Sequence, residues 1–138
     1  MKRHTVALLT LGLAVLAIVP PAMMAHHSFS AEFDNKQQVE LQGFVTKVEW
    51  TNPHVWFYIN VTDPATGRMT NWGFEMGPPH GLQAGGWTRE TMKLGDEVRV
   101  NGSRAKNGSN KVNARNVILV KTGKKMGAAS SEGDAATQ

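Results

Sequence analysis

Cysteine is absent from this 138-residue sequence, and so are the motifs that mark the commoner enzyme classes. Without cysteine, neither a disulfide framework nor a paired-cysteine metal motif can hold the domain together, so its stability must come from a hydrophobic core. The sequence has no G-x-S-x-G nucleophile elbow, no Walker loop, no dinucleotide-binding glycine fingerprint and no H-E-x-x-H motif. These absences argue against an enzyme, and we expect a non-enzymatic protein.

A hydrophobic run long enough to cross a membrane is also missing. The apolar stretch from Val6 to Val19 is about 14 residues long, whereas a membrane-spanning helix needs roughly 20. It follows a short basic start and precedes small residues that end at Ala25. This order is typical of a secretory signal peptide. We therefore predict that residues 1–25 are removed and that the mature protein is periplasmic or secreted.

The charge of the mature protein is small. The formal net charge is +4, but two of these charges belong to Lys2 and Arg3 in the predicted signal, which leaves +2. The remaining basic and acidic residues are mixed along the chain. Binding to nucleic acid requires a dense basic patch that meets the phosphates. We therefore expect no nucleic-acid binding, and no membrane association once the signal has been removed.

Alternating apolar and polar residues predict five β-strands. The clearest runs from His54 to Val61, and Gly43 in the first strand permits a bulge or a sharp bend. The predicted strands cover residues 39–50, 54–61, 68–76, 97–102 and 112–120. Period-two alternation assigns these residues to the core: Val55, Phe57, Ile59, Val61, Val98 and Val100.

The segment between the third and fourth strands is not strand-like. Leu82, Trp87 and Met92 are scattered among glycines, which predicts one or two helical turns that plug the core. Five strands with a short helical insertion between strands 3 and 4 is the order of an OB-fold barrel, although a small sandwich or another five-stranded barrel gives similar periodicity. We predict an all-β, OB-like barrel at residues 39–121, after an N-terminal arm at 26–38 and before a disordered tail at 122–138.

The acidic residues offer no clear catalytic pair. Glu49 and Glu75 lie in predicted strands, Asp96 lies in a turn, and Asp34 lies in the arm. Carboxylates in such positions are usually solvated, so we expect them at the surface. No catalytic residue is predicted.

Four histidines outside the predicted signal are candidate metal ligands, namely His26, His27, His54 and His80. If the signal peptidase cuts after Ala25, His26 becomes the N-terminal residue, and its amine and imidazole form a chelate. One further imidazole, from His27, His54 or His80, completes three nitrogen donors. Nitrogen-rich, tetragonal coordination suits Cu(II).

This copper site depends on the cleavage position. A cut after Met24 leaves an Ala25-His26-His27 terminus that binds Cu(II) through backbone nitrogens and His27. A cut after Ala22 removes the chelate at His26. The alternative interpretation is that His26 and His27 are only two polar residues of a flexible arm beside the cleavage site. Copper is the only cofactor that these residues indicate.

Aromatic residues on the second face of the clearest strand are candidate ligand-binding residues. In OB-folds, the outer face of strands 2 and 3 often binds ligands, and aromatic rings stack there on bases or sugars. Trp56 and Tyr58 share this face, and Trp72 from the next strand is a third candidate. Trp72 and Phe74 either extend this platform or belong to the core. Alternatively, the tail or the loop at residues 77–86 covers the rings.

Several short motifs stand together in the chain: Ala25–Phe29, Ala31–Asp34, Glu49–His54, Gly86–Arg89, Leu94–Val98 and Arg104–Ser109. With these motifs, the chain from Ala25 to about Leu119 resembles an uncharacterised family of small exported bacterial proteins, a domain of unknown function. The resemblance implies export and a compact β-domain, and it implies no activity. The order of elements is also similar to that of periplasmic bacterial OB-fold proteins, which is a likeness of fold alone.

The sequence thus predicts an exported, non-enzymatic binding module. Its ligand is a copper ion or a small molecule, bound by the N-terminal histidines and the aromatic strand face. The alternative is an accessory domain that docks a periplasmic partner protein through that face.

Overall fold

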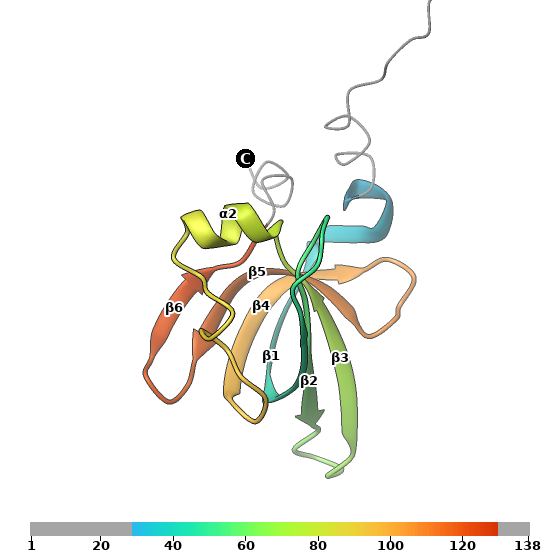
Figure 1. The fold of residues 1–138 in the computed structure, drawn as a ribbon. Coiled ribbons are helices and arrows are strands. Elements are labelled where there is room, and N and C mark those ends of the chain that lie inside the picture. Colours follow the sequence, from blue (N-terminus) through green and yellow to red (C-terminus); the bar gives the residue numbers. More distant parts are fainter. Residues whose placement is uncertain (1–28, 130–138) are drawn as a thin grey trace, which may run out of the picture.

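The alternating pattern of the sequence forms six strands in the computed structural model, which describes residues 29–129 (Figure 1). The elements are β1 (Phe33–Glu49), β2 (Trp56–Thr62), β3 (Met69–Glu75), α2 (Pro79–Ala84), β4 (Glu97–Ala105), β5 (Lys111–Leu119) and β6 (Lys124–Gly127). A helical turn at residues 29–32 precedes β1. The predicted signal, His26, His27 and residues 130–138 lie outside the described residues. No helix of the described part is long and apolar enough to cross a membrane.

Five of the strands close into a ring (Figure 1). β1 pairs antiparallel with both β2 and β4, β2 pairs with β3, and β4 pairs with β5. A short parallel pairing of β3 with β5 closes the ring, and β6 adds a sixth strand along β5. The all-β barrel is thus confirmed, with its helix between the third and fourth strands, and the order of pairing agrees with the OB-like prediction.

β1 serves two neighbours because it is long and changes partner near Gly43. Its first part, up to Phe44, pairs with β4, and its last part, from Phe44 to Glu49, pairs with β2. A Cβ atom at Gly43 would lie 2.0 Å from the carbonyl oxygen of Asn60. The two backbones therefore approach so closely that only glycine fits at this position.

The core fills the barrel with the residues that the alternation assigned to it. Phe57 and Ile59 are fully buried, and the Phe57 ring stacks on that of Phe74 with centroids 4.9 Å apart. Val55, Val98 and Val100 are also buried, whereas Val61 is only half-buried at the margin of the core.

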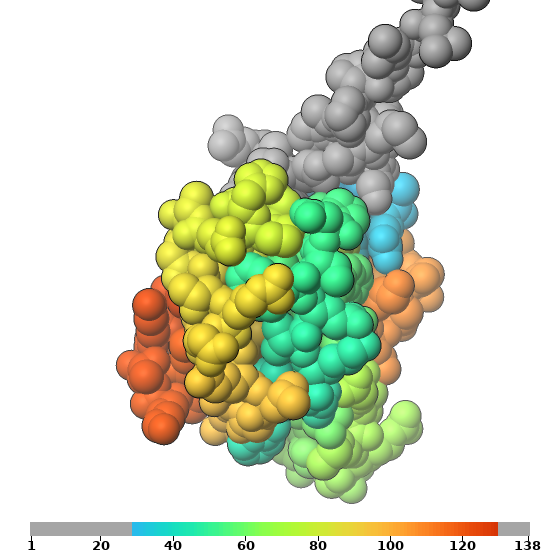
Figure 2. All heavy atoms as spheres, viewed as in Figure 1, coloured from blue at the N-terminus to red at the C-terminus, as the bar shows by residue number. Residues whose placement is uncertain are grey.

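The segment between β3 and β4 covers part of the barrel, as predicted. Leu82, Trp87 and Met92 are all buried in the core. Figure 2 shows this yellow to gold segment lying across the front of the barrel. Trp87 also donates a hydrogen bond from Nε1 to the carbonyl oxygen of Gly127, at 2.6 Å, which ties the segment to β6.

The strands extend beyond the predicted boundaries at both ends. β1 begins at Phe33, inside the predicted arm, and β6 lies at Lys124–Gly127, where we expected disorder. Main-chain pairing with β5 holds β6, and the buried side chains Met126 and Ala128 anchor it. Because β6 begins with two consecutive lysines, it has no alternation of apolar and polar residues and was not predicted. The structure therefore has six strands where the sequence predicted five.

Candidate functional site

A histidine and a carboxylate meet at one rim of the barrel. His54 lies in the loop between β1 and β2, and its Nδ1 pairs with Oε1 of Glu75 at the end of β3. Glu75 is only 8% exposed, so the expectation of a solvated carboxylate was wrong. The imidazole compensates the buried carboxylate, which would otherwise be costly to remove from water. Nε2 is the ring nitrogen of His54 that this pair does not use.

Trp56 and Tyr58 lie next to this pair on the outer face of β2. In the antiparallel pairing with β3, Trp56 stands opposite Glu75 and Tyr58 stands opposite Gly73. A Cβ atom at Gly73 would lie 3.1 Å from the Tyr58 ring, so the ring lies over this glycine. Both aromatic side chains are half-buried. Two of the three predicted ligand-binding residues are therefore neighbours.

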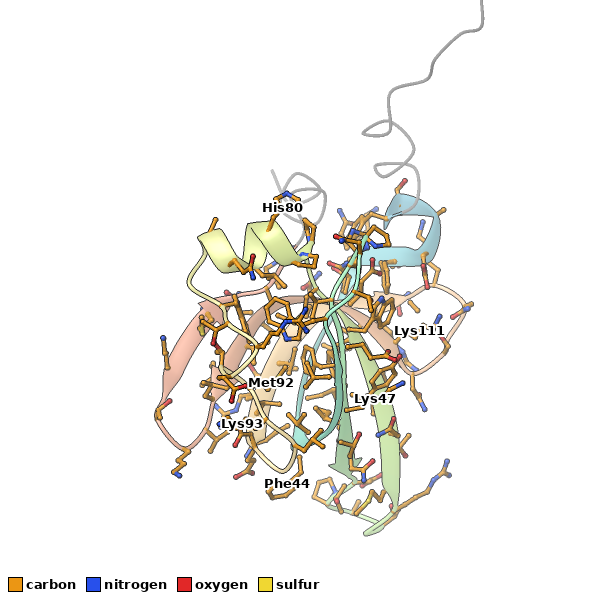
Figure 3. The ribbon with its side chains drawn as sticks, viewed as in Figure 1. Phe44, Lys47, His80, Met92, Lys93 and Lys111 are labelled. Atoms are coloured by element: carbon orange, nitrogen blue, oxygen red, sulfur yellow. The ribbon has the colours of Figure 1, made fainter. Side chains whose placement is uncertain are left out.

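A lysine lies over each of these rings. The Nζ atom of Lys47 is 5.3 Å from the centroid of the Tyr58 ring, and that of Lys111 is 5.8 Å from the centroid of the Trp56 ring. Figure 3 places Lys47 and Lys111 on the same side of the barrel. These distances are within the range of cation–π attraction. The outer face thus combines flat apolar rings with positive charge.

Glu49 links the lysine and the phenol of this face. Its carboxylate forms an ion pair with Nζ of Lys47 at 2.5 Å and accepts a 3.2 Å hydrogen bond from the Tyr58 hydroxyl. The hydrogen bond from Lys47 lowers the pKa of Glu49 below its usual value. Burial and the negative charge of Glu49 raise the pKa of Tyr58 above 10.0. Near neutral pH, the face therefore carries a charged carboxylate and a neutral phenol.

Trp72 lies on the other face of the sheet. It stands opposite Ile59, as Phe74 stands opposite Phe57, and side chains of opposed residues share a face. Phe74 is fully buried, and Trp72 packs half-buried against the core. Trp72 therefore does not extend the platform of Trp56 and Tyr58, a point that depended on strand register and was left open by the sequence.

The histidines do not gather within the described chain. His80 is the second residue of α2, is exposed, and points away from the barrel in Figure 3. His26 and His27 lie outside the described residues. Among residues 29–129, no three His, Asp or Glu side chains are placed so that they could hold a metal ion.

The start of the described chain is fixed to the loop between β4 and β5. Phe29, Phe33 and Ala105 form a small buried cluster separate from the main core, and the two rings are 5.8 Å apart. Nζ of Lys106 donates a 2.6 Å hydrogen bond to the carbonyl oxygen of Ser30. The arm is therefore docked by specific contacts. The motifs that contain Phe29 and Phe33 were the only sequence signal of this docking.

The docked arm reaches the aromatic face through one ion pair. Oε1 of Glu32 lies 3.5 Å from Nζ of Lys111, the same ammonium that lies over the Trp56 ring. Trp56 in turn stands opposite Glu75, the partner of His54. The arm, the aromatic face and the His54–Glu75 pair thus adjoin one another.

The fold and this surface define a small β-barrel with a mixed aromatic and charged outer face. The model of a family of unknown function, DUF6152, matches residues 14–114, and the chain belongs to this family. The resemblance found from the motifs is thereby confirmed. A search of the curated proteins finds no match.

Proposed function

We propose that this protein is an exported, non-enzymatic binding module that holds a copper(II) ion between His54 and an N-terminal His26. The observation that carries the proposal is the pairing of His54 Nδ1 with Glu75. A metal-ligating histidine usually binds a carboxylate or a carbonyl through its other ring nitrogen, which fixes the orientation of the ring. With Glu75 on Nδ1, His54 has Nε2 available for a metal.

The contacts of the docked arm support a short distance between His26 and His54. Phe29 is buried, and His26 lies three positions before it in the chain. Because an extended chain covers at most about 3.5 Å per residue, His26 lies within about 10 Å of Phe29 in any conformation. Glu32 connects the same arm to Lys111 beside Trp56. These contacts hold the described part of the arm beside the face that adjoins His54, and this arrangement supports the proposal.

The donor set favours copper over other metals. Cleavage after Ala25 gives His26 a free amine beside its imidazole, and His54 adds a third nitrogen. The chain has no cysteine, so no thiolate competes for the ion. Nitrogen donors in a tetragonal arrangement suit Cu(II).

The proposal is tested by titrating Cu(II) into protein whose N-terminus has been confirmed as His26 by intact mass. We expect one equivalent to bind, with a visible absorption band typical of nitrogen coordination. His26→Ala and His54→Ala should each weaken binding strongly. Glu75→Gln should weaken it by roughly 10- to 100-fold, because the carboxylate orients the ligating ring.

His80→Ala is the matched control, since His80 is exposed on α2 and takes no part in the proposed site. A second variant blocks the terminal amine of His26 by acetylation, which removes that donor and should also weaken binding. If neither His26→Ala nor His54→Ala differs from the parent protein, the copper site does not exist.

The second candidate function is docking of a partner protein through Trp56 and Tyr58. The two half-buried rings with their lysines favour it, because aromatic residues dominate many interfaces. Trp56→Ala would then abolish capture of one defined partner, whereas His54→Ala would leave that capture unchanged.

A further inference from the structure

The large hydrophobic side chains that the described residues expose are Phe44, Met69 and Leu94, at 55%, 61% and 68% exposure. They come from three segments far apart in the sequence: the bend of β1, the first residue of β3, and the turn before β4. Scattered single hydrophobic residues need no explanation, whereas a group on one surface marks an interaction site. The positions of these three side chains therefore decide whether they are scattered or form one interaction surface.

All three side chains lie at the end of the barrel opposite His54. Along β2, Trp56 marks the end near His54, and Phe44 and Met69 stand opposite Asn60 and Thr62 toward the other end. In Figure 3, Phe44 lies at the far end of the molecule from His80.

The third side chain is tied to the first by main-chain hydrogen bonds. The amide of Gly95 donates to the carbonyl oxygen of Val45 at 2.8 Å, which holds the Leu94 turn beside Phe44. A groove of about 390 Å³ lies here, and Phe44, Gly95 and Leu119 are among the residues that line it. We call this end of the barrel, with Phe44, Met69 and Leu94, the apolar end.

Cations accompany each exposed hydrophobic residue. Arg68 precedes Met69, and Lys93 precedes Leu94. Lys121 lines the groove beside Phe44, and Lys124 stands opposite Leu119 across the β5–β6 pair. Of these cations, only Lys93 has an ion-pair partner among residues 29–129, namely Glu90 at 2.9 Å. Arg68, Lys121, Lys124 and its neighbour Lys125 are left to meet an external anion.

The carboxylates of the apolar end each accept hydrogen bonds within the protein. Asp63 accepts hydrogen bonds from the amides of Ala65 and Thr66, Asp96 accepts one from the amide of Lys93, and Glu97 accepts one from the Gln42 side chain. These acidic groups reduce the net charge of this end. They therefore predict weak, reversible binding to an anionic surface that is sensitive to salt.

From this arrangement we infer that the apolar end docks onto an anionic lipid surface. A second copy of the chain is disfavoured, because it would bring the unpaired cations of two molecules together. A bound peptide is disfavoured because the three hydrophobic side chains come from three separate elements, β1, β3 and the turn before β4, rather than lying along one groove. Exposed hydrophobic residues beside lysines and arginines suit the boundary between lipid headgroups and acyl chains.

This inference is an alternative to our expectation that the processed protein does not associate with membranes, and vesicle binding distinguishes the two. That expectation rested on the small net charge of the mature chain, which does not show where exposed hydrophobic and basic side chains gather in the fold. The inference is independent of the copper proposal, and docking would leave the His54 rim facing away from the lipid.

The test is co-sedimentation of the processed protein with lipid vesicles in a buffer that contains a metal chelator. Vesicles of equal parts phosphatidylglycerol and phosphatidylcholine should bind the protein, and vesicles of phosphatidylcholine alone should bind it at least about tenfold more weakly. Raising the salt from about 0.05 to about 0.5 M should release most of the protein.

Two variants and one control locate the surface. Phe44→Ser with Leu94→Ser, and Lys121→Glu with Lys124→Glu, should each reduce binding by roughly tenfold or more. Lys36→Glu removes an exposed cation near the other end of β1, where β1 meets the end of β4, and should bind like the parent. Thermal unfolding checks that the exposed substitutions leave the fold intact.

Absence of binding to the anionic vesicles would overturn the inference. Equal binding to both kinds of vesicle, or binding that survives both double substitutions, would also overturn it. A dimer in light scattering that Phe44→Ser abolishes, without any vesicle binding, would assign the apolar end to a second copy instead.

Discussion

The two faces of β2 differ in what holds their side chains. On the inner face, Phe57 and Ile59 are fully buried and belong to the hydrophobic core. On the outer face, Trp56 and Tyr58 are half-buried and lie beneath lysines. The inner face is thus held by packing, and the outer face by contacts that water and salt weaken.

This difference separates stability from binding within a single strand. Substitutions on the inner face should unfold the domain, while those on the outer face should alter charge and ligand contacts with little effect on folding. Four measurements test how sharp this division is.

Phe57→Ala should have the largest effect. It removes a fully buried ring that stacks on Phe74, and it should lower the free energy of unfolding by roughly 3–5 kcal/mol. Phe44→Ala is the matched control, because the same residue type is 55% exposed there and should cost less than about 0.5 kcal/mol. Denaturant unfolding measures both values, and similar losses in the two variants would refute the assignment of faces.

Gly43→Ala should come next. Its new Cβ atom would meet the carbonyl oxygen of Asn60, which lies 2.0 Å from the ideal Cβ position, so β1 and β2 must move apart. We expect a loss of roughly 1–3 kcal/mol, as for other overpacked sites. Gly127→Ala is the control, because nothing lies within 4 Å of its ideal Cβ position. If both variants melt at the temperature of the parent protein, the close approach of the β1 and β2 backbones at Gly43 is refuted.

Tyr58→Phe should have a smaller effect on stability. The change removes the hydrogen bond to Glu49 and keeps the ring over Gly73. Because this bond lies at the surface, the expected loss is below about 1 kcal/mol. Chemical denaturation of this variant alone and combined with Glu49→Gln shows whether the two side chains are coupled. Fully additive losses would mean that they are not.

The smallest effect is electrostatic and can be read from one group, since Tyr58 is the only tyrosine. Burial and Glu49 raise its pKa above 10.0. A raised pKa in the folded state means that this contribution to stability is complete below about pH 10 and is lost as the pH rises through the raised pKa.

Ultraviolet absorbance of the phenolate should therefore give a midpoint above 10.0 in the folded protein. Glu49→Gln should move the midpoint part of the way back, because burial remains. Glu40→Gln removes an exposed carboxylate elsewhere on β1 and should not move it. A midpoint at the unperturbed value in the parent protein would contradict the packing of Tyr58.

The sequence was sufficient where side chains alternate between water and core. Val55, Phe57 and Ile59 could be assigned to the core because each is flanked by polar or amphipathic residues. Trp72 could not be placed, because its face depends on how β3 aligns with β2, and that alignment involves residues distant in the chain. β6 was missed because Lys124 and Lys125 carry no apolar pattern, and pairing with β5 supplies what propensity does not.

The candidate site was predicted only in part, for a similar reason. His54, Trp56 and Tyr58 stood out because their chemistry is conspicuous within one strand. Glu75 did not, since its partner is 21 residues away in the chain and only the β2–β3 pairing brings the two together. Local sequence patterns indicate which residues are candidate site residues, and strand register determines which of them are in contact.

The closure of the ring also determines when the protein can fold. β1 pairs with β4, so that Phe33 meets Ala105, and the parallel contact of β3 with β5 joins Gly73 to Lys111. Such distant pairings must be brought together against the entropy of the intervening chain, which makes folding slower than for helical proteins of this length. A chain that ends before Lys111 leaves β3 without its parallel neighbour, so the ring cannot close until β5 has been synthesised.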